Sequence, residues 1–105
     1  MSKPLRTEDE AIWELPDAIG WYEERKSGLG AQFLAADATL DRIVRLPQTG
    51  APVPHTPADL PVRRIPVKRF PYHVVYLETS ESIRILAFAH DSRRPAYWHH
   101  RTLDH

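Results

Sequence analysis

Apolar residues recur at steps of three and four along two stretches in the first half of the chain. They are Ala11, Leu15, Ala18 and Tyr22 in the first stretch, and Phe33, Ala36, Leu40 and Ile43 in the second. This spacing puts each set on one face of an α-helix. Gly28 and Gly30 lie between the two stretches, and Pro47 ends the second one. We therefore expect two amphipathic helices that pack as an antiparallel hairpin.

After Pro61 the apolar pattern changes to the two-residue period of β-strands. Val62–Val67 alternates in this way, His73–Leu77 is rich in β-branched and aromatic residues, and Ile83–His90 is apolar on both faces. The connections at 68–72 and 78–82 have hairpin length, which predicts antiparallel neighbours. Lys3–Arg6 could form a strand, but it is too short to assign from its pattern alone.

The segment 47–61 contains five of the ten prolines, so we expect an extended surface loop without regular structure. A chain of 105 residues has room for a single domain, which we assign to residues 1–105. The elements predict an α+β fold in which the helical hairpin packs on one face of a small antiparallel sheet. The opposite face of the sheet then stays free, and we expect it to be the binding surface.

The composition excludes several classes of protein. The chain has no cysteine, so disulfides and thiolate chemistry are absent. It has no apolar run near the roughly 20 residues that span a membrane, and Met1–Pro4 lacks the apolar stretch of a signal peptide. We expect a soluble, cytoplasmic protein.

The net charge of zero hides an asymmetry between the two halves. Residues 1–50 carry nine acidic and six basic side chains, whereas residues 51–105 carry five acidic and eight basic ones together with all six histidines. A basic half of this kind is able to meet a polyanion or an acidic partner. Ordinary solvated charge on exposed strands is the alternative interpretation.

The sequence lacks a glycine-rich phosphate loop, a His-Glu-x-x-His pair and a nucleophile elbow. His90, His99 and His100 have no acidic residue at a metal-ligand spacing, so we expect neither a metal site nor a cofactor.

Basic and aromatic residues gather near the ends of the predicted strands. They are His90, Arg93, Arg94, Tyr97 and Trp98 after the last strand, and Arg63, Arg64, Lys68, Arg69 and His73 around the preceding ones. Such a set suits RNA, because guanidinium groups bind phosphates, aromatic rings stack on unpaired bases and histidine moves protons near neutral pH. Alternatively, Tyr97 and Trp98 pack the last turn onto the sheet and the arginines are only solvated.

Taken in order, several stretches resemble the RelE/ParE toxin superfamily. They include Trp21-Tyr22-Glu23, Gly28-Leu29-Gly30, Val62-Arg63-Arg64, and Ala89-His90 followed by Arg93-Arg94-Pro95 and Tyr97-Trp98. The resemblance covers nearly the whole chain and implies a β-α-α-β-β-β fold. It also implies the toxin of a type II toxin–antitoxin module, held silent in a hetero-oligomer by an antitoxin segment that folds on its surface.

The superfamily divides by target. RelE-like members cut mRNA in the ribosomal A site, whereas ParE-like members inhibit DNA gyrase and have largely lost the nuclease residues. Arg64 matches a basic position of the nucleases, but Pro66, His73 and Asp91 occupy others, and among these only His73 is able to act as a base or donor. The long helical hairpin and its Gly28-Leu29-Gly30 turn look more ParE-like. We therefore expect a growth-inhibiting gyrase inhibitor of the kind associated with plasmid stabilisation.

Two alternatives stay open. In a RelE-like ribosome-dependent endoribonuclease, Arg64 and Arg93 would hold the scissile phosphate, His90 or His73 would take the 2′-hydroxyl proton, and Tyr97, which matches a tyrosine of those nucleases, would stack or donate. In an inactive homologue, only antitoxin binding would remain. In the lead interpretation the target or nucleic-acid surface consists of Arg63, Arg64, Lys68, Arg69, Arg94 and Trp98.

Overall fold

The computed structural model describes residues 3–12, 14, 29–53, 61–68, 70–91 and 97–103. Residues 9–12 and 14 are helical and follow the first strand. The elements are β1 (Leu5–Thr7), α2 (Leu29–Arg45), the 3₁₀ turn η1 (Pro47–Thr49), β2 (Ala51–Pro52), β3 (Val62–Pro66), β4 (Tyr72–Glu78), β5 (Ile83–His90) and the 3₁₀ turn η2 (His99–Leu103). This order confirms the expected α+β fold. The remainder of the predicted first helix, including Leu15, Ala18 and Tyr22, lies outside the described residues.

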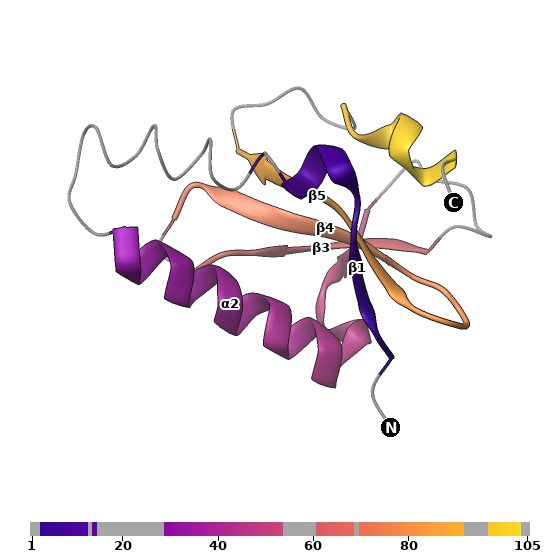
Figure 1. The fold of residues 1–105 in the computed structure, drawn as a ribbon, viewed down its shortest axis with the longest axis horizontal. Coiled ribbons are helices and arrows are strands. Elements are labelled where there is room, and N and C mark those ends of the chain that lie inside the picture. Colours follow the sequence, from indigo (N-terminus) through magenta and orange to yellow (C-terminus); the bar gives the residue numbers. More distant parts are fainter. Residues whose placement is uncertain are drawn as a thin grey trace.

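The strands form one five-stranded sheet in the order β1-β5-β4-β3-β2 (Figure 1). The pairs β3–β4 and β4–β5 are antiparallel, as the hairpin-length connections predict, and β2 pairs antiparallel with β3. β1 instead runs parallel to β5, so the sheet is mixed rather than purely antiparallel. Helical segments lie between β1 and the β3–β5 meander in the chain, and a parallel pairing such as that of β1 with β5 requires a long connection of this kind.

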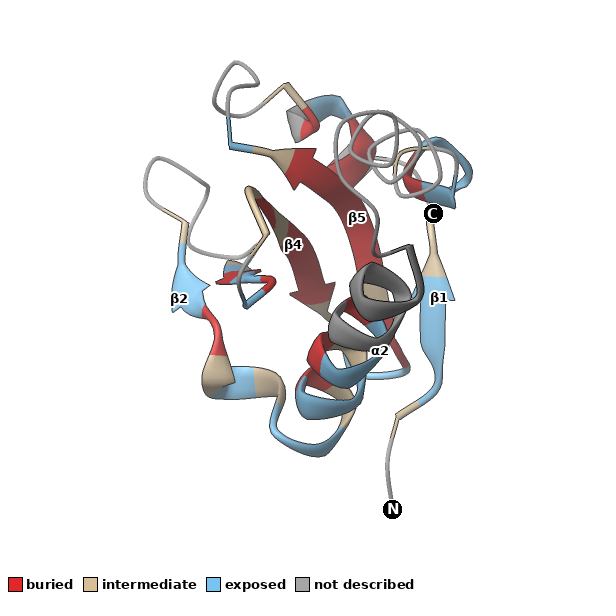
Figure 2. Cartoon of the chain, turned by 90° about the vertical axis from the view of Figure 1, so that its left-hand side faces the viewer, coloured by how far each residue is buried: buried red, intermediate tan, exposed pale blue. Residues whose placement is uncertain are grey.

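α2 covers one face of the sheet, which we call the helix face (Figures 1 and 2). Its apolar stripe is buried at Ala36 and Ile43, while Asp37 and Arg42 on the opposite side are exposed. Arg42 and Arg45 stand in the last turn, where positive charge complements the helix dipole. The core that α2 meets consists of Ile65, Val67, Tyr72, Val74, Tyr76, Ile83, Ile85 and Phe88, together with Ala11.

The opposite face, here the far face, has a second core that includes Trp98 from the C-terminal segment. Trp98 is only 3% exposed, and its neighbours are Val62, Val75, Leu77, Leu86, Ala87 and Ala89. The expectation of a completely free far face was therefore correct only in part. The chain covers much of that face with its own indole, which removes apolar surface from water. On the same face Arg64 is exposed, and His73 keeps 19% of its side chain exposed.

A β-bulge in β5 sets which residues reach each face. Tyr76 pairs with Ile85 and Val75 pairs with Ala87, which leaves Leu86 without a partner in β4. Leu86 and Ala87 consequently both belong to the far-face core. A bulge of this type reverses the alternation of all residues that follow it.

The loop between α2 and β3 is more regular than expected, since it contains η1 and β2. The Tyr76 hydroxyl donates to the Pro47 carbonyl (2.6 Å) and accepts from the Gly50 N–H (2.9 Å). A Cβ at Gly50 would lie 2.6 Å from that hydroxyl and 2.9 Å from the Arg64 carbonyl oxygen, so only glycine fits. Residues 54–60 lie outside the described part. No helix among the described residues is long and apolar enough to cross a membrane.

The same substitution should affect the stability of the two core tyrosine sites differently. Tyr76→Phe leaves the buried Gly50 N–H and the Pro47 carbonyl without this partner, and we expect a loss of about 1–3 kcal/mol in unfolding free energy. The Tyr72 hydroxyl is buried without a hydrogen-bond partner in the described part of the chain. Tyr72→Phe should therefore be neutral or stabilising.

Urea denaturation of both variants at pH 7 provides the measurement. Burial raises the pKa of Tyr72 and Tyr76 above the ordinary tyrosine value, so both phenols are protonated at this pH. Equal destabilisation by the two substitutions would contradict the prediction.

Candidate functional site

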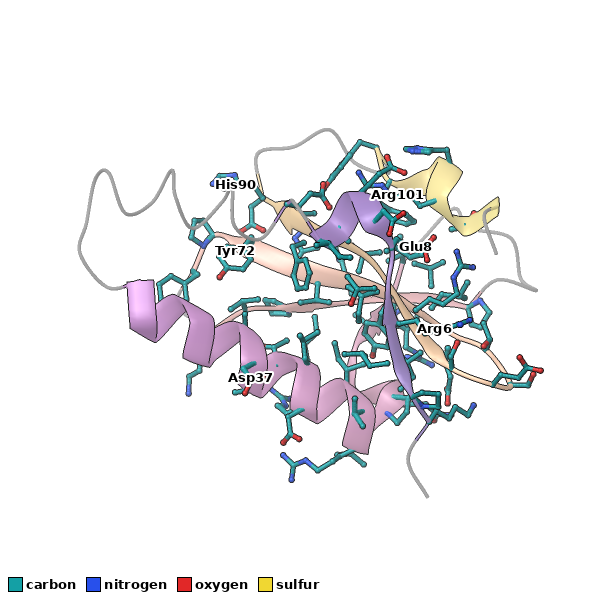
Figure 3. All side chains as sticks on the ribbon, in the orientation of Figure 1. Arg6, Glu8, Asp37, Tyr72, His90 and Arg101 are labelled. Atoms are coloured by element: carbon teal, nitrogen blue, oxygen red, sulfur yellow. The ribbon has the colours of Figure 1, made fainter. Side chains whose placement is uncertain are left out.

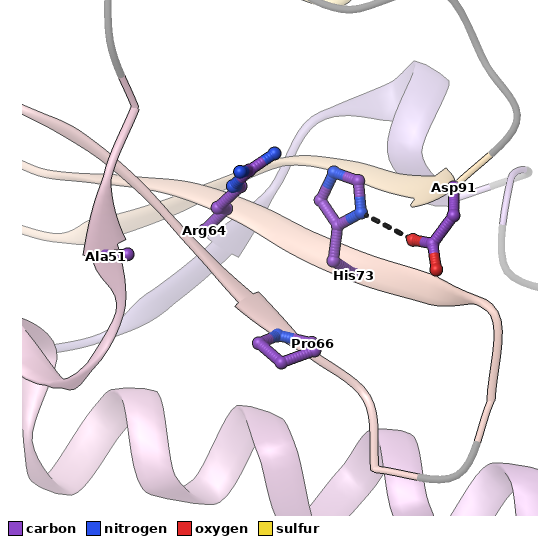
Figure 4. Close-up of a pocket in the computed structure, with 5 residues that line it drawn as sticks. All are labelled: Ala51, Arg64, Pro66, His73 and Asp91. Carbon is purple, nitrogen blue, oxygen red and sulfur yellow. Dashed lines mark hydrogen bonds and ion pairs between the residues drawn. The ribbon is translucent and has the colours of Figure 1, made fainter.

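An open groove on the far face brings together polar side chains from neighbouring strands. It has a volume of about 360 Å³ and is lined by Ala51, Arg64, Pro66, His73 and Asp91 (Figure 4). His73 on β4 pairs in register with Pro66 on β3, and Arg64 lies two residues earlier on the same face of β3. Asp91 follows the end of β5. Three strands and the residue after β5 thus build the groove.

His73 is held in one orientation by Asp91. Its Nδ1 lies 3.0 Å from Asp91 Oδ1, and the Asp91 N–H donates to the Pro71 carbonyl at 2.8 Å. A carboxylate only accepts hydrogen bonds, so Nδ1 carries the proton. In the neutral ring, Nε2 is then the acceptor. Asp91 acts as a positioning residue that fixes the tautomer of His73.

The groove combines this imidazole with a free cation. Arg64 is exposed and has no ion-pair partner among the described residues, and Lys68 in the following turn is also exposed. A guanidinium group binds a phosphate or carboxylate through two parallel hydrogen bonds. The site is therefore able to bind an anion at Arg64 and to accept a proton from a hydroxyl at His73.

His90 does not join Arg64 and His73. His90 pairs with Tyr72, a residue of the helix-face core, whereas His73 pairs with Ala89 of the far-face core. Directly paired residues share a face of the sheet. Figure 3 shows His90 at the end of β5. The structure thus separates the two histidines that the sequence proposed as alternative bases.

Arg63 also faces away from the groove. It pairs with Tyr76 of the helix-face core, and its Nη1 donates to the Gly50 carbonyl at 2.8 Å and to the Gln48 carbonyl at 3.5 Å. Arg63 therefore holds the loop before β2. Arg69, Arg93 and Arg94 lie outside the described residues.

Glu14 and Arg101 form a buried ion pair, which we call the clasp. Tyr97 contacts both of its members. Arg101 Nη1 donates to Glu14 Oε1 at 2.7 Å and to the Leu86 carbonyl at 2.8 Å. The Tyr97 hydroxyl donates to the same carboxylate, and the Tyr97 ring lies 5.2 Å from the Arg101 guanidinium carbon. Glu14 also accepts from the Phe88 N–H at 3.2 Å.

The clasp extends to further charges at the start of the first helix. Arg84 bridges Glu8 (3.0 Å) and the Arg101 carbonyl (2.9 Å). A hydrogen bond from His100 lowers the pKa of Glu10. Burial disfavours the charged form of Arg101, yet the hydrogen bond and charge of Glu14, together with the charge of Glu10, outweigh it and keep the pKa of Arg101 above its ordinary value. Arg101 Nε makes no hydrogen bond with the residues that the structure describes, although Glu10 Oε2 lies within ion-pair range at 3.4 Å.

Sequence reasoning did not anticipate the clasp or the Asp91 contact. Glu10 and Glu14 are four residues apart, which is the spacing of one helix face. That spacing is a signal for a shared partner, but it does not identify Arg101. In the sequence alone, Asp91 indicates only the loss of a basic residue.

No family model matches the chain. No curated protein matches it either. Among solved structures, the chain is similar to one in the structure described as the chromosomal ParDE TA system from P. aeruginosa, with a TM-score of 0.65 and 18% identity. The match covers 84% of this chain and 95% of that chain. This likeness shows the fold, which is that of a ParE-like toxin, as the sequence motifs predicted.

The tautomer of His73 is a direct test of the groove geometry. In the unchanged protein we expect the neutral ring to carry its proton on Nδ1. Asp91→Asn weakens this preference, because an amide is able to donate as well as accept. Long-range ¹H–¹⁵N correlation spectra of the histidine rings measure the tautomer. A wild-type His73 protonated on Nε2 would contradict the assignment.

Proposed function

We propose that this protein is the toxin of a type II toxin–antitoxin module, that a cognate antitoxin neutralises it, and that it acts by binding DNA gyrase. The ParE-like fold carries the proposal. The solved structure to which the chain is similar is itself described as a toxin–antitoxin system. The groove between β1 and α2 and the groove of Arg64 and His73 provide separate surfaces, one for an antitoxin and one for a target.

The composition of the groove favours binding over chemistry. A nuclease without a metal needs a base, an acid and cations that stabilise a crowded phosphate. Here Pro66 occupies one position, Asp91 adds a negative charge, and the Tyr97 hydroxyl is bonded to Glu14. Inhibition of gyrase by binding requires none of these proton transfers.

A supercoiling assay tests the target. Purified toxin at micromolar concentration should inhibit gyrase or trap its cleavage complex, and pre-incubation with the antitoxin should abolish the effect. The antitoxin sought is the product of an adjacent gene. Unchanged supercoiling at these concentrations, with growth still arrested in cells, would exclude gyrase as the target. Absence of growth arrest would instead fit an inactive homologue.

The His73–Asp91 contact beside Arg64 favours one second candidate, a ribosome-dependent endoribonuclease. In that reaction the 2′-oxygen forms a bond to phosphorus and the bond from phosphorus to the 5′-oxygen breaks. His73 Nε2 would take the 2′-hydroxyl proton, the leaving 5′-oxygen would gain a proton from water, and Arg64 would stabilise the phosphorane. A positioned base of this kind contributes about 10²–10⁴-fold in rate.

Primer extension on mRNA after induction separates the two candidates. A nuclease produces discrete new 5′ ends, which His73→Ala should reduce by at least 100-fold. His90→Ala is the matched control, because His90 belongs to the other face of the sheet. Cleavage that survives His73→Ala, or that His90→Ala abolishes, would contradict this role for the groove.

A further inference from the structure

A pocket of about 390 Å³, which we call the hairpin pocket, lies where β1 meets the turn between β4 and β5. It is lined by Arg6 in β1, Glu8 directly after β1, Arg84 in β5 and residues 79–82 of the turn. Arg6 pairs in register with Arg84, and Arg84 pairs with Leu77 of the far-face core. Both arginines therefore belong to the far face of the sheet. Figure 3 shows Arg6 and Glu8 beside β1.

The two arginines of the hairpin pocket differ in how far they are neutralised. Arg84 Nη2 donates to Glu8 Oε1 at 3.0 Å and to the Arg101 carbonyl at 2.9 Å. Its Nε and Nη1 make no hydrogen bond with the described residues, so donors remain on this guanidinium. Arg6 is exposed, and no residue in the described part of the chain pairs with it. The pocket therefore contains one free cation and one that is partly used.

The acidic residues around the pocket are mostly occupied. Glu8 is bonded to Arg84, and Glu78 at the end of β4 accepts from Lys3 Nζ at 2.9 Å. Glu81 at the tip of the turn is exposed and has no partner within the described ranges. Of these three carboxylates, Glu81 alone is left to oppose an anion beside Arg6.

The spacing of the two guanidinium groups suits a tetrahedral anion. Neighbouring strands lie about 4.8 Å apart, so Arg6 and Arg84 are able to reach the same ligand. Like charges on paired positions are unfavourable, and an anion between them removes this repulsion. Ser80 is exposed on the same pocket and adds a hydroxyl donor. Three donor groups match the three free oxygens of a monoester phosphate better than the two of a carboxylate.

We propose that the hairpin pocket binds a phosphate group, either as inorganic phosphate or as the monoester phosphate of a nucleotide. Arg6 provides the free guanidinium, Arg84 adds its remaining donors and Ser80 contributes its hydroxyl. Among the described residues no aromatic ring lines the pocket, so it offers a base nothing to stack on. The inference goes beyond the proposed function, because it requires neither a particular target nor an antitoxin.

NMR titration of the full-length protein at constant ionic strength tests the site. With inorganic phosphate, the amides of Ser80 and Glu81 and the Nε–H of Arg6 should shift together and saturate at millimolar concentration. Adenosine monophosphate should produce the same shifts, whereas adenosine should produce none. Acetate should bind at least about tenfold more weakly, because it has one acceptor oxygen fewer.

The two sources of phosphate are distinguished by their affinities. Adenosine monophosphate that binds at least about tenfold tighter than inorganic phosphate would identify a nucleotide as the ligand. Equal affinities would identify inorganic phosphate, since the nucleoside then adds nothing.

Two substitutions should change phosphate affinity in opposite directions. Arg6→Gln should weaken binding at least about tenfold, because a charge-assisted hydrogen bond is lost. Glu81→Gln should tighten binding by about two- to fivefold, because a nearby exposed like charge is removed. Arg42→Gln, which changes an exposed arginine on α2 that does not line the pocket, is the matched control and should leave the affinity unchanged.

Thermal unfolding separates a binding role of Arg6 from a structural one. Without phosphate, Arg6→Gln should not lower the melting temperature, because it removes the repulsion by Arg84. Added phosphate should raise the melting temperature of the unchanged protein more than that of the variant.

Four results would overturn the phosphate site. They are shifts confined to other surfaces such as the groove of Arg64, acetate binding as tightly as phosphate, unchanged affinity in Arg6→Gln, and a lower melting temperature of Arg6→Gln without phosphate. The last result would give Arg6 a structural role instead. None of these outcomes bears on growth arrest or supercoiling, so the proposed function is tested independently.

Discussion

The clasp between Glu14 and Arg101 satisfies backbone polar groups of β5 that lie beyond the end of β1. Beyond the three residues of β1, the edge of β5 presents the Leu86 carbonyl and the Phe88 N–H, and no described strand pairs with them there. Arg101 bonds the carbonyl and Glu14 bonds the N–H. A buried backbone group without a partner costs about 1–3 kcal/mol, so both side chains are required at this edge.

The clasp also decides how much of the far face is free. It joins the start of the first helix to the C-terminal segment, and this segment carries Trp98 onto the far-face core. Removing one partner of a buried ion pair leaves an uncompensated charge, which is more costly than never having the pair. The indole is therefore fixed in place. Among the described residues, the groove of Arg64 and His73 stays open on this face.

The sequence predicted the elements whose signal is local. The apolar spacing from Phe33 to Ile43 lies within α2, and the apolar run Ile83–His90 coincides with β5. The sequence did not predict β2, because a strand of two residues, one of them proline, is too short to show an alternating pattern. The sequence also did not predict the parallel pairing of β1 with β5, because this pairing joins residues almost 80 positions apart, such as Leu5 and Ile83.

The alternation of residues along a regular strand does not predict which face of the sheet His90 occupies, because β5 contains a bulge. Counting alternately from Ile83 would place His90 on the face opposite to Ile83, beside His73. The bulge at Leu86 shifts the count by one residue, and His90 returns to the face of Ile83. The same shift explains why His73, rather than His90, accompanies Arg64. Contacts such as that of His73 with Asp91 then follow from the tertiary arrangement alone.

Two grooves lie on different strands and on opposite faces of the sheet. β1 and β3 are separated by β5 and β4, so with strands about 4.8 Å apart they lie about 14 Å from one another. The groove lined by Leu5, Leu40 and Val44 lies between β1 and α2 on the helix face, whereas Arg64 and His73 belong to the far face. An extended segment bound in one groove must therefore continue around the edge of the sheet by at least about five residues to reach the other. Occupancy of one groove by itself leaves the other open.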